Sequence, residues 1–426
     1  MSALGRMADF EMMNLPDALA ARVAEAGLTT PTPIQAQAIP HALNGRDVLG
    51  LAQTGTGKTA AFGIPLIARL MLEGGKPAPK TARGLILAPT RELAAQIGKV
   101  LRDLTSLRVQ IVVGGVSINP QIQRLSKGAD ILVATPGRLL DLVERKAIHL
   151  GHTGFLVLDE ADQMLDLGFV HALRKIAALM GEDRQTMLFS ATMPKQMNEI
   201  AQTYLRSPVR VEVSPPGKAA DKIEQSVQFI AKAEKAALLA ELLDKHRENR
   251  ALVFTRTKHG ADRLSRGLER KGFAVAAIHG DKRQGQRDRA LAAFKAREIR
   301  VLVATDVAAR GLDIPDVRYV YNYELPNVPE AYVHRIGRTA RAGKDGLAVA
   351  LCAPDEMAQL KDIQKIMKLQ VPVASGRPWE ALPDPDEAPQ ARRRGPARGK
   401  PGGNPGAKPG GRAGQRRRRK PRPKAS

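Results

Sequence analysis

The chain has 426 residues, more than one hydrophobic core usually serves, so we expect two domains plus tails. Its formal net charge of +24 favours a polyanionic partner, and nucleic acid is the first candidate. A single cysteine, Cys352, excludes an intramolecular disulfide and a thiolate metal cluster, which suits a reducing cytoplasm. Neither a membrane-spanning apolar run nor a signal-peptide pattern is recognisable, so the sequence predicts no membrane association.

Short apolar or β-branched runs alternate with helical patterns from Val48 to about Val213. In chain order the runs are VLGLA, GLILAP, VQIVVG, DILVAT, GFLVLDE, QTMLFSAT and VRVEV. Such alternation predicts a parallel sheet covered by helices on both faces. We therefore place a first α/β domain at residues 1–213.

The first of these runs is followed by AQTGTGKT and then by an apolar helical stretch. This is the strand–loop–helix setting of a phosphate-binding P-loop, with Ala52 where the motif has its first glycine. Lys58 is expected to meet the β- and γ-phosphates of a nucleotide, and Thr59 to ligate Mg²⁺. The residues that the pattern assigns to nucleotide binding are Ala52, Gln53, Thr54, Gly55, Thr56, Gly57, Lys58 and Thr59.

The run GFLVL ends in the acidic segment Asp159–Asp162, at the edge where open α/β sheets bind ligands. Asp159 can hold Mg²⁺ through its waters, and Glu160 can activate or orient an attacking water. Taken alone, such a quartet is more often a solvated helix N-terminus. Downstream of a P-loop and at a strand end, it favours catalysis.

The segment SPPGKAADK at residues 214–222 interrupts the pattern and predicts an interdomain linker. A second alternating series follows and predicts a second α/β domain at residues 223–372. Beyond it, proline, glycine and basic residues dominate, so we predict a disordered tail over residues 373–426. Residues 391–426 contain 14 Lys or Arg and no acid.

The second domain has no P-loop but contains the segment HRIGRTAR. Its arginines Arg335, Arg338 and Arg341 recur every three residues, along one side of a helix or helical turn. From these residues alone, a solvated basic face is as good an interpretation as a functional site.

Taken together, these segments resemble the DEAD-box ATP-dependent RNA helicases of superfamily 2. The resemblance rests on GLTTPTPIQ, AQTGTGKT, PTREL, TPGR, DEAD, SAT, VATDVAARGLDI and HRIGRTAR, in the family's order, from Phe10 to about Cys352. It implies two tandem RecA-like domains that close on ATP and RNA and locally unwind short duplexes or remodel RNA–protein complexes. The phrase ADQMLDLGF and the basic tail resemble the bacterial RhlE-type branch.

The resemblance assigns roles that the residues alone leave ambiguous. It implies that Phe10 stacks on adenine, that Gln35 reads the adenine edge and that Asp313 holds the ribose. Without it, Phe10 is more simply a core anchor and Gln35 a helix-surface residue. It also makes arginine fingers of Arg338 and Arg341, which would make hydrolysis depend on domain closure. The residues that would couple the domains are Ser190, Thr192 and His334.

The same resemblance places RNA contacts in both domains. They are Thr90, Arg91, Gly115, Thr135, Arg138, Gly280, Arg287 and Thr305. Such residues grip phosphates and sugars without reading bases, and with only 4% aromatic residues a base-stacking platform is not expected. We therefore expect single-stranded RNA and short duplexes to bind with low sequence specificity, whether from ribosome precursors or through the RNA degradation machinery. Leu28 and Ala340 depart from the family pattern.

Two other functions stay open at this point. A DNA helicase or translocase would share the P-loop and the arginine fingers. An RNA chaperone would anneal strands through the basic tail, with ATP turnover incidental. The tail could also be a solubilising extension that touches nothing.

Overall fold

A computed structural model of the chain describes residues 10–52, 55–213, 223–309, 317–340 and 345–379. The predicted linker at 214–222 and the tail beyond residue 379 lie outside the described residues. So do four predicted site residues, namely Gln53, Thr54, Asp313 and Arg341.

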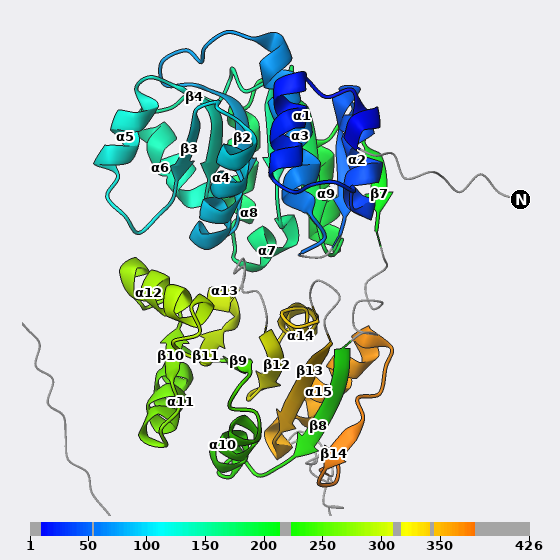
Figure 1. Cartoon of the computed structure of the whole chain (residues 1–426), viewed down its shortest axis with the longest axis vertical. Coiled ribbons are helices and arrows are strands. Elements are labelled where there is room, and N and C mark those ends of the chain that lie inside the picture. Colours follow the sequence, from blue (N-terminus) through cyan, green and yellow to red (C-terminus); the bar gives the residue numbers. More distant parts are fainter. Residues whose placement is uncertain (1–9, 53–54, 214–222, 310–316, 341–344, 380–426) are drawn as a thin grey trace, which may run out of the picture. The chain divides into compact units, whose positions relative to one another are not determined.

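The first domain contains a seven-stranded sheet whose neighbouring strands are all parallel, as the alternating pattern predicts (Figure 1). All seven predicted runs form strands. They are β1 (Val48–Leu51), β2 (Ala82–Leu87), β3 (Val109–Val112), β4 (Ala129–Ala134), β5 (Phe155–Leu158), β6 (Gln185–Ser190) and β7 (Val209–Glu212). Their order across the sheet is β3-β4-β2-β5-β6-β1-β7.

Helices cover both faces of this sheet. The helices are η1 (Phe10–Met13), α1 (Asp17–Glu25), α2 (Pro33–Leu43), α3 (Lys58–Glu73), α4 (Arg91–Leu104), α5 (Asn119–Leu125), α6 (Pro136–Glu144), α7 (Ala161–Asp166), α8 (Val170–Leu179) and α9 (Lys195–Tyr204). Apolar residues of α1–α4 share one core cluster, and those of α5–α9 share the cluster on the opposite face. In α4, Leu93, Ile97, Leu101 and Leu104 recur at helical spacing and are buried, which fixes the face that meets the sheet.

The second domain contains another seven-stranded parallel sheet. Its strands are β8 (Ile223–Phe229), β9 (Arg250–Thr255), β10 (Val275–Ile278), β11 (Val301–Thr305), β12 (Val317–Asn322), β13 (Gly346–Cys352) and β14 (Val373–Ser375). The order β10-β11-β9-β12-β13-β8-β14 repeats that of the first sheet, with each strand in the place of the strand numbered seven lower. Both sheets are therefore built on the same RecA-like topology.

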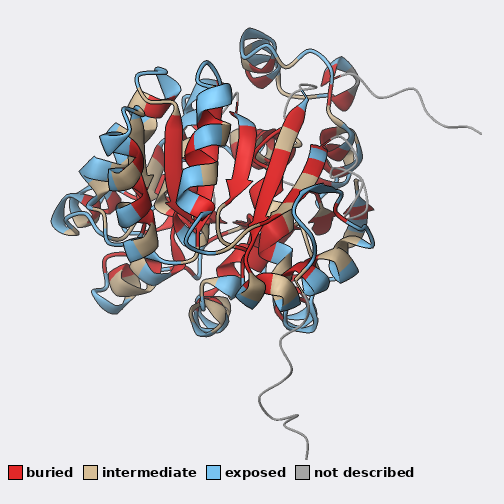
Figure 2. Ribbon diagram, turned by 90° about the horizontal axis from the view of Figure 1, so that it is seen from below, coloured by how far each residue is buried: buried red, intermediate tan, exposed pale blue. Residues whose placement is uncertain are grey.

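Helices again lie on both faces of the second sheet. They are α10 (Lys235–Lys245), α11 (Lys258–Arg270), α12 (Gln284–Lys295), α13 (Asp306–Ala309), α14 (Pro329–Ile336), η3 (Pro354–Glu356) and α15 (Met357–Met367). Apolar residues of α10 and α11 share one cluster, while those of α12–α15 pack in the clusters that contain the remaining sheet residues. Buried residues dominate the central strands, as parallel sheets require (Figure 2).

The predicted start of the disordered tail at Val373 is wrong. Val373–Ser375 form β14, which pairs with β8, and the indole of Trp379 donates a hydrogen bond to the Cys352 carbonyl at 3.2 Å. The open edge of β8 offers backbone partners to this segment, which its proline- and glycine-containing sequence does not reveal. The second domain therefore reaches at least to Trp379.

Across the described ranges, no helix combines the length and apolarity that a bilayer crossing needs.

Candidate nucleotide and RNA sites

The predicted nucleotide residues follow three neighbouring strands of the first sheet. The P-loop comes after β1, the acidic segment after β5 and the SAT segment after β6, and β6 lies between the other two. Because parallel strands end at one edge, the topology brings the three segments together. This is the edge where doubly wound sheets bind ligands.

The described part of the P-loop has the backbone that phosphate binding requires. Gly55 and Gly57 have φ angles of +86° and +90°, in the left-handed region that favours glycine. A Cβ atom on Gly57 would lie 2.5 Å from Gln35 Nε2, so only glycine fits without displacing that side chain. Helix α3 begins at Lys58, directly after these turns, and its N-terminus favours an anion.

Gln35 holds the P-loop from the neighbouring helix α2. Its Nε2 donates to the Gly57 carbonyl at 3.0 Å, and its Oε1 accepts from the Thr32 backbone N–H at 2.9 Å. The side chain is buried, so Gln35 is not a helix-surface residue. The sequence Thr32–Gln35 is a capping-box pattern, a signal from which the Thr32 contact could have been predicted. One N–H and one lone pair of the amide remain for other partners, so the geometry leaves room for adenine reading.

Lys58 and Asp159 face each other across the site. Lys58 Nζ lies 3.9 Å from Asp159 Oδ1, and both side chains are buried. Burial raises the pKa of Asp159 to about 6, although the nearby Lys58 charge acts in the opposite direction. The Glu160 backbone N–H donates to Asp159 Oδ1 at 2.9 Å, which fixes the carboxylate at the end of β5.

The donor set fits a magnesium ion that is shared with phosphates. Within the described ranges, no group of three or more His, Cys, Asp or Glu could hold a metal. Mg²⁺ characteristically binds through one or two protein oxygens plus substrate phosphates and water, and a hydroxyl and a carboxylate beside a P-loop meet that requirement. Thr59 and Asp159 are the residues that would hold it.

Asp162 joins the acidic segment to the SAT segment, a role that sequence analysis missed. Its Oδ2 accepts from the backbone N–H groups of Ala191 and Thr192 at 3.1 and 2.9 Å, and from the Thr192 hydroxyl at 3.0 Å. The Ser190 hydroxyl donates to the Thr192 carbonyl at 2.7 Å. The predicted coupling residues Ser190 and Thr192 are therefore tied directly to the segment that carries Asp159 and Glu160.

The two described arginines of HRIGRTAR, Arg335 and Arg338, do not form a solvated basic face. Arg335 is 2% exposed and lies over the Phe254 ring. Its Nη2 donates to Asp306 Oδ2 at 2.8 Å, and its Nη1 donates to Asn322 Oδ1 at 3.1 Å. Arg338 is 3% exposed, and its Nε donates to the His334 carbonyl at 3.3 Å. Arg335 is thus a structural residue.

The predicted RNA contacts of the first domain gather around one loop. Arg91 begins α4 after β2, with Thr90 as its N-cap residue, and Thr135 immediately precedes α6 after β4. A Cβ on Gly115 would lie 1.8 Å from Arg91 Nη1, and Arg138 Nη2 donates to the Val116 carbonyl at 3.1 Å. Two guanidiniums therefore flank the Gly114–Val116 loop, at the same sheet edge as the P-loop.

In the second domain, Gly280 is exposed just after β10, Arg287 lies on α12 and buried Thr305 ends β11. These positions follow adjacent strands at one side of the sheet. His334 lies in α14, after β12, and precedes Arg338 by one helical turn.

Phe10 packs in the first domain's core cluster and is 7% exposed, and Leu28 packs against the same cluster. Phe10 therefore packs as a core residue, and its stacking on adenine stays a prediction.

Known proteins are similar to this chain over both domains. A DEAD/DEAH box helicase model matches residues 32–200, and a helicase conserved C-terminal domain model matches residues 234–343. The chain is 44% identical over 365 residues to the DEAD-box ATP-dependent RNA helicase CshA of Bacillus cereus, covering 85% of this chain and 69% of that protein. This chain belongs to the DEAD-box family of ATP-dependent RNA helicases. The ATP-dependent RNA helicase CshA of Listeria monocytogenes is 43% identical over 377 residues, covering 88% and 72% of the two chains.

Among solved structures, that of S. cerevisiae Dbp5 bound to RNA and ADP BeF3 is similar to this DEAD-box chain with a TM-score of 0.77. The identity is 31%, over 86% of this chain and 95% of that one. Family membership favours RNA unwinding over the DNA helicase alternative.

Proposed function

We propose that this DEAD-box chain couples ATP binding and hydrolysis to local unwinding of RNA duplexes and remodelling of RNA–protein complexes. The observation that carries the proposal is that one sheet edge of the first domain brings together the residues predicted for ATP binding and those predicted for RNA binding. The P-loop, acidic and SAT segments follow β1, β5 and β6, and the predicted RNA contacts Arg91, Gly115 and Arg138 follow β2, β3 and β4 respectively. ATP and RNA would therefore act on one rigid scaffold.

Hydrolysis would use the buried polar residues of the first domain. Lys58 would contact the β- and γ-phosphates, and Glu160 would orient and deprotonate the attacking water. Thr59 and Asp159 would hold Mg²⁺, which neutralises phosphate charge as the leaving group departs. Support comes from the burial of Lys58 and Asp159 and from their separation of 3.9 Å.

The second domain would complete the site. Arg338 and Arg341 would meet the γ-phosphate as arginine fingers, and Asp313 would hold the ribose. His334 would contact Ser190 and Thr192, whose attachment to Asp162 would transmit RNA binding to the acidic pair. Boundaries of 1–213 for the first domain, 214–222 for the linker and 223 onward for the second accord with the family matches at 32–200 and 234–343.

The RNA would be gripped through its backbone, with low sequence specificity. Ribosome precursors and degradation intermediates are candidate substrates, since both contain short structured duplexes. We also assign the chain to the RhlE-type branch on its ADQMLDLGF phrase and basic tail, although the relatives compared above carry the name CshA. A cytoplasmic location agrees with the single cysteine.

The change Glu160→Gln tests the hydrolytic assignment. It should preserve ATP and RNA binding and slow hydrolysis by roughly 10² or more, because a general base contributes about 10²–10⁴. Steady-state phosphate release at saturating ATP and RNA measures the effect. Glu144→Gln, at an exposed position at the end of α6, is the matched control and should hydrolyse ATP at the normal rate. Near-normal turnover of Glu160→Gln would remove Glu160 from catalysis.

A further inference from the structure

The second domain contains a cavity of about 410 Å³ that the helicase assignments leave unused. It opens at the carboxyl ends of β8, β9, β12 and β13, between α10 and α11. Apolar side chains of Leu264 and Leu268 form part of its wall, together with Tyr323. The volume lies within the range of roughly 300–1,000 Å³ that is usual for small-molecule sites.

The cavity occupies the second sheet's counterpart of the nucleotide site. In the shared strand order, β8 takes the place of β1, and β12 and β13 take those of β5 and β6. Helix α10 begins with Lys235, as α3 begins with Lys58. The connection from β8 to α10 reads IAKAE and has no glycine, so it cannot form a P-loop.

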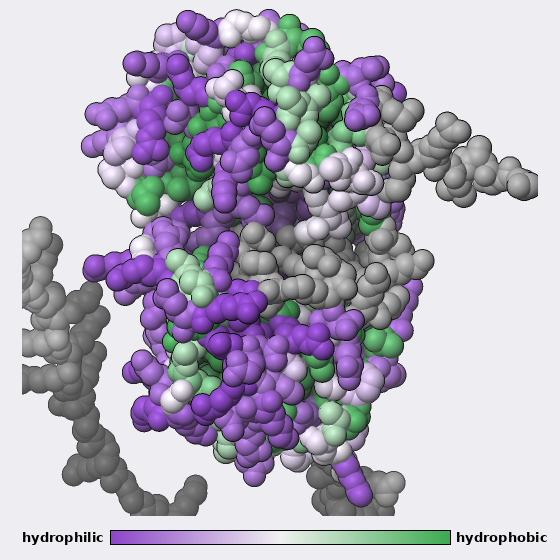
Figure 3. All heavy atoms as spheres, viewed as in Figure 1, coloured by the Kyte–Doolittle hydropathy of each residue, from purple (hydrophilic) through white to green (hydrophobic). Residues whose placement is uncertain are grey.

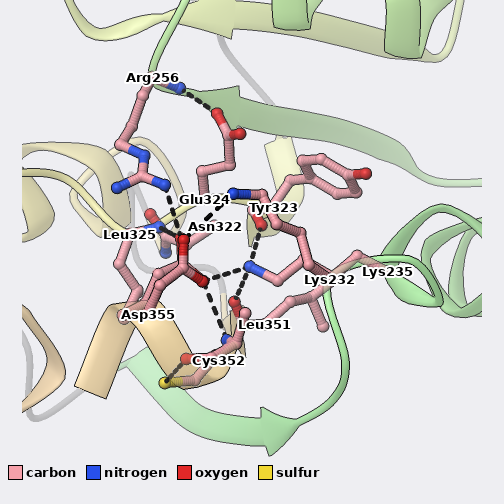
Figure 4. A network of polar contacts seen from close by, with 12 residues as sticks. Lys232, Lys235, Arg256, Asn322, Tyr323, Glu324, Leu325, Leu351, Cys352 and Asp355 are labelled. Carbon is pink, nitrogen blue, oxygen red and sulfur yellow. Dashed lines mark hydrogen bonds and ion pairs between the residues drawn. The ribbon is translucent and has the colours of Figure 1, made fainter. Parts of the chain in front are cut away.

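Lys235 is fully engaged inside the domain. Its Nζ donates to the carbonyls of Tyr323 and Leu351 at 2.8 and 2.7 Å and pairs with Glu356 (Figure 4). The side chain is 2% exposed and its ammonium group already has three partners within the domain. A ligand of the cavity must therefore be held by other cations.

The charge around the cavity is positive. Six cations line it, Lys232, Lys235, Arg256, Arg263, Arg270 and Lys271, against the three acids Glu324, Asp355 and Glu356. Each acid has a partner within the domain. Asp355 pairs with Lys232 at 3.1 Å, Glu324 accepts from the Arg256 backbone N–H at 2.7 Å, and Glu356 pairs with Lys235. The exposed Arg263, Arg270 and Lys271 supply the excess of three positive charges. Hydrophilic residues predominate on the face of this domain that Figure 3 shows.

We propose that this cavity binds a small ligand of the nucleoside phosphate class, independently of the P-loop site. The phosphates meet Arg263, Arg270 and Lys271, which lie on α11 and at its C-terminal end. The uncharged part of the ligand lies against Tyr323 and the leucines of α11. The predicted RNA contacts of this domain follow β10 and β11, whereas the cavity opens at the ends of β8, β9, β12 and β13, of which β9 alone neighbours β11. Binding of a single strand of RNA is therefore a separate outcome of the test.

Equilibrium dialysis of the full-length protein with labelled ADP, GDP and UDP tests the proposal by stoichiometry. The wild-type chain should bind two equivalents of at least one of these nucleotides, and Lys58→Ala should keep one. The double variant Arg263→Ala/Arg270→Ala should raise the dissociation constant of the second equivalent by about 100-fold, roughly tenfold for each charged contact. Arg266→Ala is the matched control, because Arg266 is an exposed cation of the same helix that does not line the cavity, and it should leave both equivalents in place.

Three results would overturn the proposal. The wild-type chain could bind only one equivalent of every nucleotide, or Arg266→Ala could weaken binding of the second equivalent as much as the double variant does. The third result is displacement of the second equivalent of nucleotide by tetrauridylate. The last result would make the cavity part of the RNA surface. Melting temperatures of the variants check that they are folded, and the charge reversal Arg263→Glu, at an exposed position, gives a second means of abolishing binding. RNA-stimulated ATP hydrolysis without added competitor should be normal in the double variant, so failure of this proposal is distinguishable from failure of the helicase assignment.

Discussion

At the scale of single residues, the arginines of one short segment have separate roles. Arg335 pairs with Asp306 inside the second domain and lies over Phe254, so it maintains the fold. Arg338 lies three residues further along the chain, just beyond the end of α14, and its proposed partner is a phosphate. Spacing in the sequence cannot separate these roles, because a three-residue repeat only places side chains on one side of a helix. Burial and partners separate them.

Ala340, two residues after Arg338, has a φ of +54° and packs against the apolar cluster of α14 and α15. A left-handed conformation is unfavourable for a residue with a Cβ. Ala340→Gly should therefore increase the free energy of unfolding of the second domain by about 0.5–1 kcal/mol. The substitution relieves backbone strain in the folded state, and the greater flexibility of glycine in the unfolded chain offsets part of that relief. Urea unfolding followed by the fluorescence of Trp379, the chain's single tryptophan, measures this domain.

Ala296→Gly is the matched control for this change. Ala296 is exposed in the same domain and has a φ of −72°, so its replacement should destabilise by about 0.5–1 kcal/mol. If both glycine variants lose stability equally, Ala340 carries no backbone strain.

At the scale of elements, the extent of the second domain depends on a short edge strand. Deleting everything after Trp379 should leave domain stability unchanged, whereas ending the chain at Pro372 removes β14 and the Trp379–Cys352 hydrogen bond. We expect a loss of about 2–3 kcal/mol for the shorter chain, since each hydrogen bond contributes about 1 kcal/mol net. Urea unfolding followed by circular dichroism compares the two. Equal midpoints would show that β14 adds nothing to the fold.

Much of both sheets could be predicted from the sequence, because buried parallel strands consist of apolar runs that alternate with helical patterns. Strand β14 could not, since it has three residues, all exposed, and is a strand only because β8 offers an edge. In the site, the P-loop and the acidic segment could be predicted, because the spacing of residues within each motif determines its chemistry. The contact between Gln35 and Gly57 spans 22 residues and that between Asp162 and Thr192 spans 30, and such pairings depend on tertiary structure.

At the scale of the whole molecule, the 14 cations of residues 391–426 accompany a helicase whose proposed catalytic residues all precede Cys352. Binding by such a segment releases counterions from RNA, so its affinity falls with salt. Deleting residues 391–426 should raise the RNA dissociation constant at low salt and flatten the slope of log affinity against log salt, while the ATPase rate at saturating RNA stays normal. Salt titrations of both proteins measure the slopes. Identical slopes would mean that the tail is a solubilising extension.

The RNA-chaperone alternative has its own test, the remodelling of RNA duplexes by Glu160→Gln. Duplex remodelling by this variant at the full rate would support that alternative.

RNA-stimulated ATP hydrolysis by the full chain tests most directly whether residues of both domains form one catalytic site. Arg338→Ala should bind ATP normally, yet its rates with and without RNA should converge, because the finger acts only when the domains close. Arg318→Ala, an exposed arginine of β12, is the control and should keep full stimulation. Undiminished stimulation by RNA in Arg338→Ala would contradict a shared site, and hydrolysis would then belong to the first domain alone.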